Sequence, residues 1–259
     1  MLKKTLFIIS LLILVSCGKN EELKSPAEEQ INKYREELKD CKEGKASDDK
    51  EANSAIAGDN SAQKPEGNII PVVPKETPHI RGFGIEEDDI VYGNRESKVV
   101  VIEYFSPTCP HCVTYHKKIF PEIRSKYIDT NKIAYISREF IGNKQDLDAA
   151  VLARCGGSIK SYDNFMQIFL EQQDSWAFSK NYREILTNIG TLGGIGPEKY
   201  AKCLNDEAKI QILMDNTLLV SKVPQFIGTP TFFINGKKFD KPYTVVELSK
   251  AIDLALGIR

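Results

Sequence analysis

The chain has 259 residues, a formal net charge of −1 and a sequence pI of about 6.4. Charged residues make up 27% and aromatic residues 9%, which is ordinary for a globular protein. This balance excludes a strongly basic nucleic-acid-binding protein, and we expect no nucleic-acid partner. The length suits one or two domains with a sizeable core.

The first 17 residues are typical of a targeting segment. Two lysines precede an apolar run, Thr5 to Val15, which is too short to span a bilayer as a helix. The following Ser16-Cys17-Gly18 completes a pattern that resembles the lipobox of bacterial lipoproteins, which implies a lipid anchor on Cys17. An ordinary cleaved signal peptide is the alternative. Both interpretations put the mature protein in the bacterial cell envelope, where disulfides persist, and leave open which membrane holds an anchor.

Residues 18–86 have a different composition from the rest. Ser25, Pro26 and Glu28 predict a helix start, and apolar residues then follow a heptad stripe, so we expect a short helix over residues 26–44. Small and polar residues beyond it predict a disordered tether. The helix is either a dimerisation element that Cys41 could bridge or a solvated amphipathic stretch.

We expect one folded domain over residues 87–259. Residues 88–93 predict a short strand, and Val99 to Phe105 predicts a strand buried on both faces, because the run is β-branched and aromatic. A helix over 109–127, interrupted near Pro121, and a strand over 132–140 complete a βαβ unit.

A helical insertion follows, at about residues 145–222. Apolar residues recur at helical spacing over 162–170 and 182–189, residues 190–197 break the pattern, and a long helix is expected over 206–222. The chain then returns to a β-hairpin turning at Asn235-Gly236 and a last helix opened by Thr244. The predicted class is α/β, with the order βαβ, helical insertion, ββα.

The sequence Cys109-Pro110-His111-Cys112 directly follows the buried strand and opens the next helix. This context indicates a redox pair, since a structural zinc site needs four ligands, usually as two closely spaced pairs. No second CxxC or HxxxH motif occurs in the chain. We therefore predict neither a metal nor a bound cofactor.

The placement of the two cysteines predicts different chemistry for each thiol. Cys109 precedes a helix, where free backbone N–H groups and the macrodipole stabilise a thiolate and lower its pKa. His111 can add a donor or a positive charge. Cys112, one turn further, is expected to be buried and to act as the resolving thiol.

With Gly228-Thr229-Pro230-Thr231 before the returning strand, the CPHC motif and the insertion resemble the DsbA-like thiol:disulfide oxidoreductases of the thioredoxin superfamily. The resemblance covers about Asp88 to Gly257 and implies a thioredoxin fold. It implies that Thr229 and Pro230 form a cis-proline loop beside the cysteines, where the Thr229 backbone pairs with substrate. A proline that merely opens an edge strand is the alternative.

The resemblance also gives roles to buried groups. It implies that Glu103 lies beneath the cysteine pair and assists proton transfer, whereas the alternative is a strand-end glutamate that reaches solvent. His116 is expected at the surface, tuning local charge. Some DsbA-like proteins carry a structural disulfide in the insertion, which implies a Cys155–Cys203 bridge; two buried free thiols are the alternative.

The function implied is a dithiol oxidase that introduces disulfides into exported proteins with free cysteines and is recharged by a quinone-linked membrane partner. A disulfide isomerase or reductase on the same fold is one alternative. The other is a non-enzymatic lipoprotein, such as a copper-binding chaperone, that uses the cysteines as metal ligands.

Overall fold

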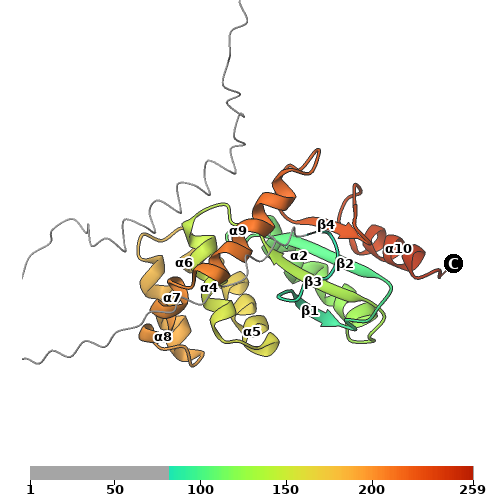
Figure 1. Ribbon diagram of the computed structural model, residues 1–259. Helices are drawn as coiled ribbons and strands as arrows, with labels where there is room; N and C mark the ends of the chain where they lie inside the picture. Colours follow the sequence, from blue (N-terminus) through green and yellow to red (C-terminus); the bar gives the residue numbers. More distant parts are fainter. Residues whose placement is uncertain (1–81, 259) are drawn as a thin grey trace, which may run out of the picture.

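The computed structural model describes residues 82–258, which form a mixed sheet beside a body of helices (Figure 1). The expected lipidation site, Cys17, the helix over 26–44 and Cys41 lie outside these residues. Among the described residues, no helix is both long enough and apolar enough to cross a membrane.

The sheet has five strands in the order β1-β3-β2-β4-β5. Strands β2 and β3 run parallel, as the βαβ unit requires, and the other neighbours pair antiparallel. The central strand β2 is buried on both faces beyond its first residue, which its β-branched and aromatic composition favours. The strand bounds are β1 (Ile90–Gly93), β2 (Val100–Phe105), β3 (Ala134–Glu139), β4 (Thr231–Ile234) and β5 (Lys237–Lys238).

The helix that follows the CPHC motif is broken into three pieces. They are α2 (Pro110–Lys118), α3 (Phe120–Ile123) and a π-helical turn, η1 (Arg124–Ile128). Pro121 lies in the first turn of α3, where its missing N–H costs no helical hydrogen bond. The interruption predicted near Pro121 is therefore confirmed, although it falls at Ile119.

The insertion is helical throughout. Its longest helix, α9, begins after Asp206, whose side chain accepts a hydrogen bond from the backbone N–H of Lys209. The break after α7 starts at Gly193 and not at Gly190, which is buried inside that helix. The helices are α4 (Lys144–Cys155), α5 (Ile159–Glu171), α6 (Gln173–Trp176), α7 (Tyr182–Leu192), α8 (Pro197–Leu204) and α9 (Glu207–Ser221), and the chain ends with α10 (Val245–Ala255).

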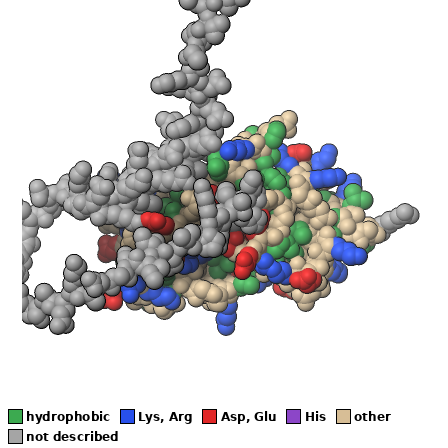
Figure 2. Space-filling model, viewed as in Figure 1, with side chains coloured by type: hydrophobic (Ala, Val, Ile, Leu, Met, Phe, Trp, Pro, Cys, Tyr) green, Lys and Arg blue, Asp and Glu red, His purple; other side chains and the backbone are tan. Residues whose placement is uncertain are grey.

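The two faces of the sheet bury separate apolar clusters. On one face, side chains of β2, β3 and β4 pack against α2, α3, α10 and the insertion. On the other, a smaller cluster that includes Ile102 and Phe233 is covered by Phe83 and by the end of α9. The exposed surface in Figure 2 mixes basic, acidic and apolar side chains, in keeping with the net charge of −1.

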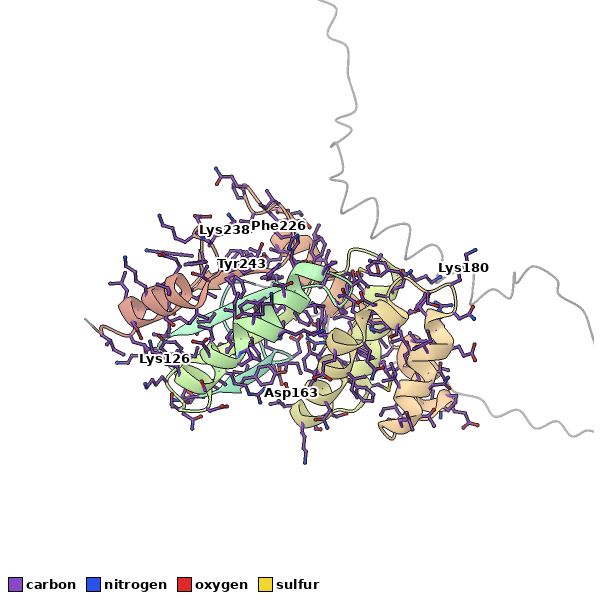
Figure 3. All side chains as sticks on the ribbon, turned by 180° about the vertical axis from the view of Figure 1, so that it is seen from behind. Lys126, Asp163, Lys180, Phe226, Lys238 and Tyr243 are labelled. Atoms are coloured by element: carbon purple, nitrogen blue, oxygen red, sulfur yellow. A yellow bond between two sulfur atoms is a disulfide. The ribbon has the colours of Figure 1, made fainter. Side chains whose placement is uncertain are left out.

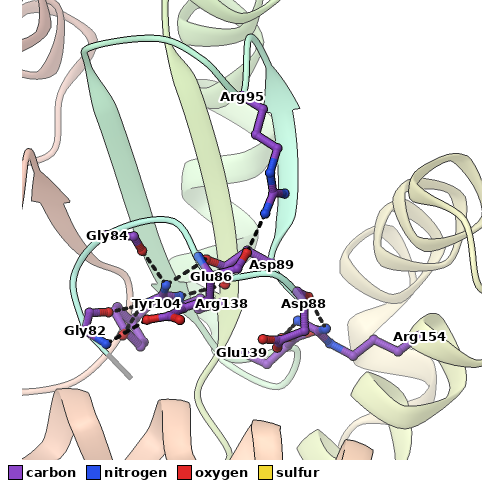
Figure 4. Close-up of polar contacts among 10 residues, drawn as sticks. All are labelled: Gly82, Gly84, Glu86, Asp88, Asp89, Arg95, Tyr104, Arg138, Glu139 and Arg154. Atoms are coloured by element: carbon purple, nitrogen blue, oxygen red, sulfur yellow. Dashed lines mark hydrogen bonds and ion pairs between the residues drawn. The ribbon is translucent and has the colours of Figure 1, made fainter. Parts of the chain in front are cut away.

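Residues 82–89 are fastened to the sheet by one buried arginine (Figure 4). Arg138 on β3 forms an ion pair of 2.7 Å with Asp89 and donates to the backbone oxygens of Gly82 and Gly84, each at 2.7 Å. Since Phe83 also stacks on Phe233, the folded unit includes residues 82–86, which the sequence had assigned to the linker.

Candidate active site

The CPHC motif lies after the end of β2, at the start of α2. Cys109 is the residue before the helix, with extended backbone angles, and its carbonyl oxygen accepts the backbone N–H groups of Cys112 and Val113 at 3.1 and 3.2 Å. Pro110 occupies the first helical position, which suits its fixed φ and missing donor. Both thiols are free; Cys109 is half-buried and Cys112 is fully buried.

The pKa of Cys109 is lowered from 9.0 to about 5. A hydrogen bond from the Cys112 thiol is the largest cause, and the backbone N–H groups of Cys112 and His111 add to it against the opposing effect of burial. The His111 side chain is exposed, so the described contribution of His111 comes from its backbone. Cys109 is therefore a thiolate near neutral pH and can act as the nucleophile.

The pKa of Cys112 is shifted in the opposite direction, well above 9.0. Burial is the main cause, followed by the hydrogen bond to Cys109 and the negative charges of Cys109 and Glu103. The two thiols of one motif thus prefer different protonation states, and a proton must move whenever the bond between them forms or breaks.

The loop before β4 brings residues from the far end of the sequence to Cys109. The Thr229–Pro230 peptide bond is cis, and the Cys109 Sγ lies 3.2 Å from the Thr229 carbonyl oxygen. The following strand β4 pairs with both β2 and β5, so Pro230 does not open an edge strand. The cis-proline loop and the reactive sulfur are thus in direct contact.

Glu103 is completely buried in β2, so the interpretation as a strand-end residue reaching solvent is wrong. Its Oε2 accepts the Tyr135 hydroxyl at 2.6 Å, and its Oε1 lies 2.9 Å from Nε2 of His116. The surface role expected for His116 is also wrong, because one turn beyond Cys112 the helix points this ring back at β2. The partners that burial of a carboxylate demands are thus present.

Comparisons with known proteins agree with this geometry. Residues 86–254 match the model of the family described as Thioredoxin. A Rickettsia felis protein with the provisional name protein-disulfide oxidoreductase is 43% identical, over 98% of this chain and 95% of its own length. A Rickettsia typhi protein with the same provisional name is 45% identical, over 98% of this chain and 97% of its own.

Among solved structures, Wolbachia pipientis alpha-DsbA1 is 28% identical with a TM-score of 0.61, covering 67% of this chain and 94% of that protein. This chain is a DsbA-like member of the thioredoxin family. BdbD from Bacillus subtilis, at 21% identity and a TM-score of 0.60, shares the fold. The protein is accordingly a thiol-disulfide oxidoreductase.

In this DsbA-like site, the loop between β2 and Cys109 is held by the insertion. Asp146, near the start of α4, accepts the Ser106 hydroxyl at 2.8 Å and the Thr108 backbone N–H at 2.9 Å through Oδ1. Its Oδ2 accepts the backbone N–H of Gly142 at 3.0 Å. Gln173 of α6 donates to the backbone oxygen of Pro107 at 2.7 Å. These contacts fix the backbone that presents Cys109.

Sequence reasoning missed Asp146, Gln173 and the contact of His116. A signal existed for Asp146, because Asn143 followed three residues later by an acid is typical of a helix start, and Asn143 does accept the Asp146 backbone N–H. Nothing local indicates that the carboxylate turns back to a loop 38 residues earlier.

The second cysteine pair of this protein lies in the insertion. Cys155 at the end of α4 and Cys203 in α8 form a disulfide with a Cα–Cα distance of 5.8 Å, as the family resemblance implied. The alternative of two free buried thiols is wrong. Within residues 82–258 no cluster of three or more His, Cys, Asp or Glu is arranged to hold a metal ion.

Proposed function

We propose that this protein is a dithiol oxidase of the bacterial cell envelope that introduces disulfides into exported proteins. The observation that carries the proposal is the opposite shift of the two thiols: the pKa of Cys109 falls to about 5 while that of Cys112 rises. A stabilised thiolate makes the reduced pair comparatively favourable, so the Cys109–Cys112 disulfide is a strong oxidant.

The reaction proceeds by two thiolate attacks. A substrate thiolate attacks the Cys109 Sγ of the active-site disulfide; the bond to Cys112 breaks, and its electron pair stays on the Cys112 Sγ, which takes up a proton. A second substrate thiolate then attacks the substrate sulfur bonded to Cys109 and releases Cys109 as a thiolate. The substrate gains a disulfide, and its two electrons remain on the reduced pair.

Neighbouring residues assist each step. Pro110 and the backbone N–H of His111 hold the N-terminal turn of α2 in the geometry that favours the Cys109 thiolate. The backbone of Thr229 pairs with an extended substrate segment while Pro230 keeps the loop against the cysteines. Glu103, in its protonated form, gives a proton to the leaving Cys112 thiolate, and its carboxylate takes the proton back during reoxidation. The electrostatic effect of the Glu103 carboxylate on the Cys112 thiol supports this role, because it shows that the two groups influence each other.

The cellular setting belongs to the same proposal. Lipidation of Cys17 would anchor the protein at the membrane surface facing the periplasm, and the polar segment after it would let the domain reach its substrates. A quinone-linked membrane protein would reoxidise the pair by accepting its two electrons.

The reduction potential of the Cys109–Cys112 pair tests the direction of the reaction. We would equilibrate the protein in glutathione buffers and quantify free thiols by alkylation and mass. A variant with alanine at Cys17, Cys41, Cys155 and Cys203 leaves the active-site pair as the only cysteines that can titrate. A potential near about −120 mV, the value for DsbA, is expected for an oxidase. A value near about −270 mV, as in thioredoxin, would overturn the oxidase and indicate a reductase.

A further inference from the structure

The proton that Cys112 gains and loses during the reaction must move between a buried thiol and solvent. Cys112 and Glu103 are each 0% exposed, so neither exchanges a proton with bulk water directly. In the proposed reaction the Cys112 thiolate is protonated when the active-site disulfide opens, and the Cys112 thiol must lose that proton when the pair is reoxidised. Each turnover therefore needs a route between this buried pair and solvent.

On one side of the Glu103 carboxylate, no route for a proton leads to solvent. Its Oε2 accepts the hydroxyl of Tyr135, and the hydroxyls of Tyr135 and Tyr115 lie 3.0 Å apart. Both tyrosines are fully buried, and burial raises the pKa of each well above 10.0, so they stay protonated. This branch orients the carboxylate and ends inside the protein.

The other side reaches a cavity. The Oε1 of Glu103 lies 2.9 Å from Nε2 of His116, whose side chain keeps 16% of its surface exposed. The ring lines a cavity of about 400 Å³ between α2, α3 and α5. The exposed residues Lys117 and Glu171 belong to its wall, so the cavity opens to the surface. A space of this size that opens to the surface and has charged side chains among its lining residues admits water.

We propose that His116 is a proton-relay residue that connects Glu103 with water in this cavity. The inference rests on the proposed role of Glu103 as the proton donor to Cys112. When Glu103 has given its proton to the Cys112 thiolate, the imidazole passes the proton on Nε2 to Oε1 and takes another from cavity water at Nδ1. During reoxidation the same transfers run in reverse, and no electrons move through the ring.

Aromatic rings and charged side chains surround His116. Phe120, Tyr115 and Phe105 hold the ring, with centroids 4.8, 5.3 and 5.8 Å away. Asp163 of α5, labelled in Figure 3, faces the cavity from the insertion. Charged side chains of both signs therefore line the cavity together with the ring. The titratable groups that line the cavity with His116 are Tyr92, Lys117, Arg124, Tyr162, Asp163 and Glu171.

The test uses the full-length protein with His116→Ala and His116→Gln. Rapid mixing would follow reoxidation of the reduced pair by a small disulfide, with the reduction potential measured in parallel. We expect both variants to be slowed at least about tenfold, because a positioned proton-transfer group contributes ~10²–10⁴-fold. Added imidazole should enter the enlarged cavity of His116→Ala and restore most of the rate, without effect on His116→Gln.

Controls separate the possible failures. Lys118→Gln removes a cation from the same helix outside the cavity and should leave the rate unchanged. Circular dichroism checks that each variant is folded, and Gln keeps a donor for Glu103 should Ala unfold. Unchanged rates in both His116 variants, or a slow His116→Ala variant that imidazole fails to restore, would overturn the relay. If Glu103→Gln is slowed and the His116 variants are not, the proposed role of Glu103 stands and the relay alone fails.

Discussion

The two thiols of the CPHC motif differ because they lie at different depths. Cys109 lies before the first turn of α2, where backbone N–H groups point at its sulfur, and it keeps part of its surface in solvent. Cys112 faces the apolar core and has Glu103 as a charged neighbour. The same hydrogen bond lowers one pKa and raises the other, so the pair behaves as a coupled unit.

Substitution of Cys112 tests this coupling. In Cys112→Ala, Cys109 loses the hydrogen bond that lowers its pKa most, so the pKa should rise clearly above about 5. Cys112→Ser keeps a hydroxyl donor and should cause a smaller rise. The pH dependence of ultraviolet thiolate absorbance and of alkylation measures both. Equal values in the two variants and in the reduced wild type would instead assign the shift to the helix terminus.

The raised pKa of Asp146 predicts that the stability of the folded protein depends on pH. Burial raises its pKa from 3.8 to about 6, so between these values the folded protein holds a proton that the unfolded chain has released. The contribution of Asp146 to stability is therefore greatest at low pH and falls as the pH rises through about 6. The hydrogen bonds from Ser106 and Thr108 offset part of the cost of burying the charge.

Asp146→Asn removes this titration. The free energy of unfolding of the wild type, relative to the variant, should fall by about 2 kcal/mol between about pH 4 and about pH 7. Urea unfolding of both proteins at several pH values measures the difference. Parallel curves over the whole range would show that the carboxyl group is ionised without cost.

At the scale of elements, the insertion does more than enlarge the domain. Helices α4 and α6 supply Asp146 and Gln173, which hold the loop in front of Cys109, and α5 closes one side of the cavity beside His116. The insertion is itself tied together by the Cys155–Cys203 bridge between α4 and α8. Side chains of the insertion are therefore part of what positions the active-site backbone.

The disulfide should contribute stability with little effect on the reactive thiol. The cysteines are 48 residues apart in sequence, and closing a loop of that length corresponds to about 4 kcal/mol in the chain-entropy description. Cys155→Ala/Cys203→Ala should lose about 2–4 kcal/mol in urea unfolding. Alkylation should find the pKa of Cys109 unaltered, and a large change there would show that the bridge acts on the site itself.

The sequence predicted the elements better than the contacts between them. The buried strand predicted over Val99 to Phe105 is observed over Val100 to Phe105, and α2 begins at the CPHC motif, because hydrophobic periodicity and helix-start chemistry are local. The ring of His116 was misplaced, since whether a polar residue on a helix faces water depends on which strand it packs against. The π-helical turn after Pro121 has no local signature that periodicity detects.

At the scale of the whole molecule, the predicted lipid anchor is separable from the fold. Residues 82–258 bury their own core, so Cys17→Ser should leave thiol-disulfide exchange intact. The substitution should move the protein from the membrane fraction to the soluble fraction and abolish fatty-acid labelling. A labelled or membrane-bound Cys17→Ser protein would contradict lipidation at this cysteine.

The Arg138 contacts give the domain a mechanical property. A pulling force applied to Gly82 through the preceding chain would act on the Arg138 guanidinium. This group is hydrogen-bonded to the carbonyl oxygens of Gly82 and Gly84 and ion-paired with Asp89 inside the protein. Arg138 belongs to β3, which is hydrogen-bonded on both sides by β1 and β2. A force on the N-terminal end of the domain is thus transmitted to an inner strand of the sheet and does not peel an edge strand away.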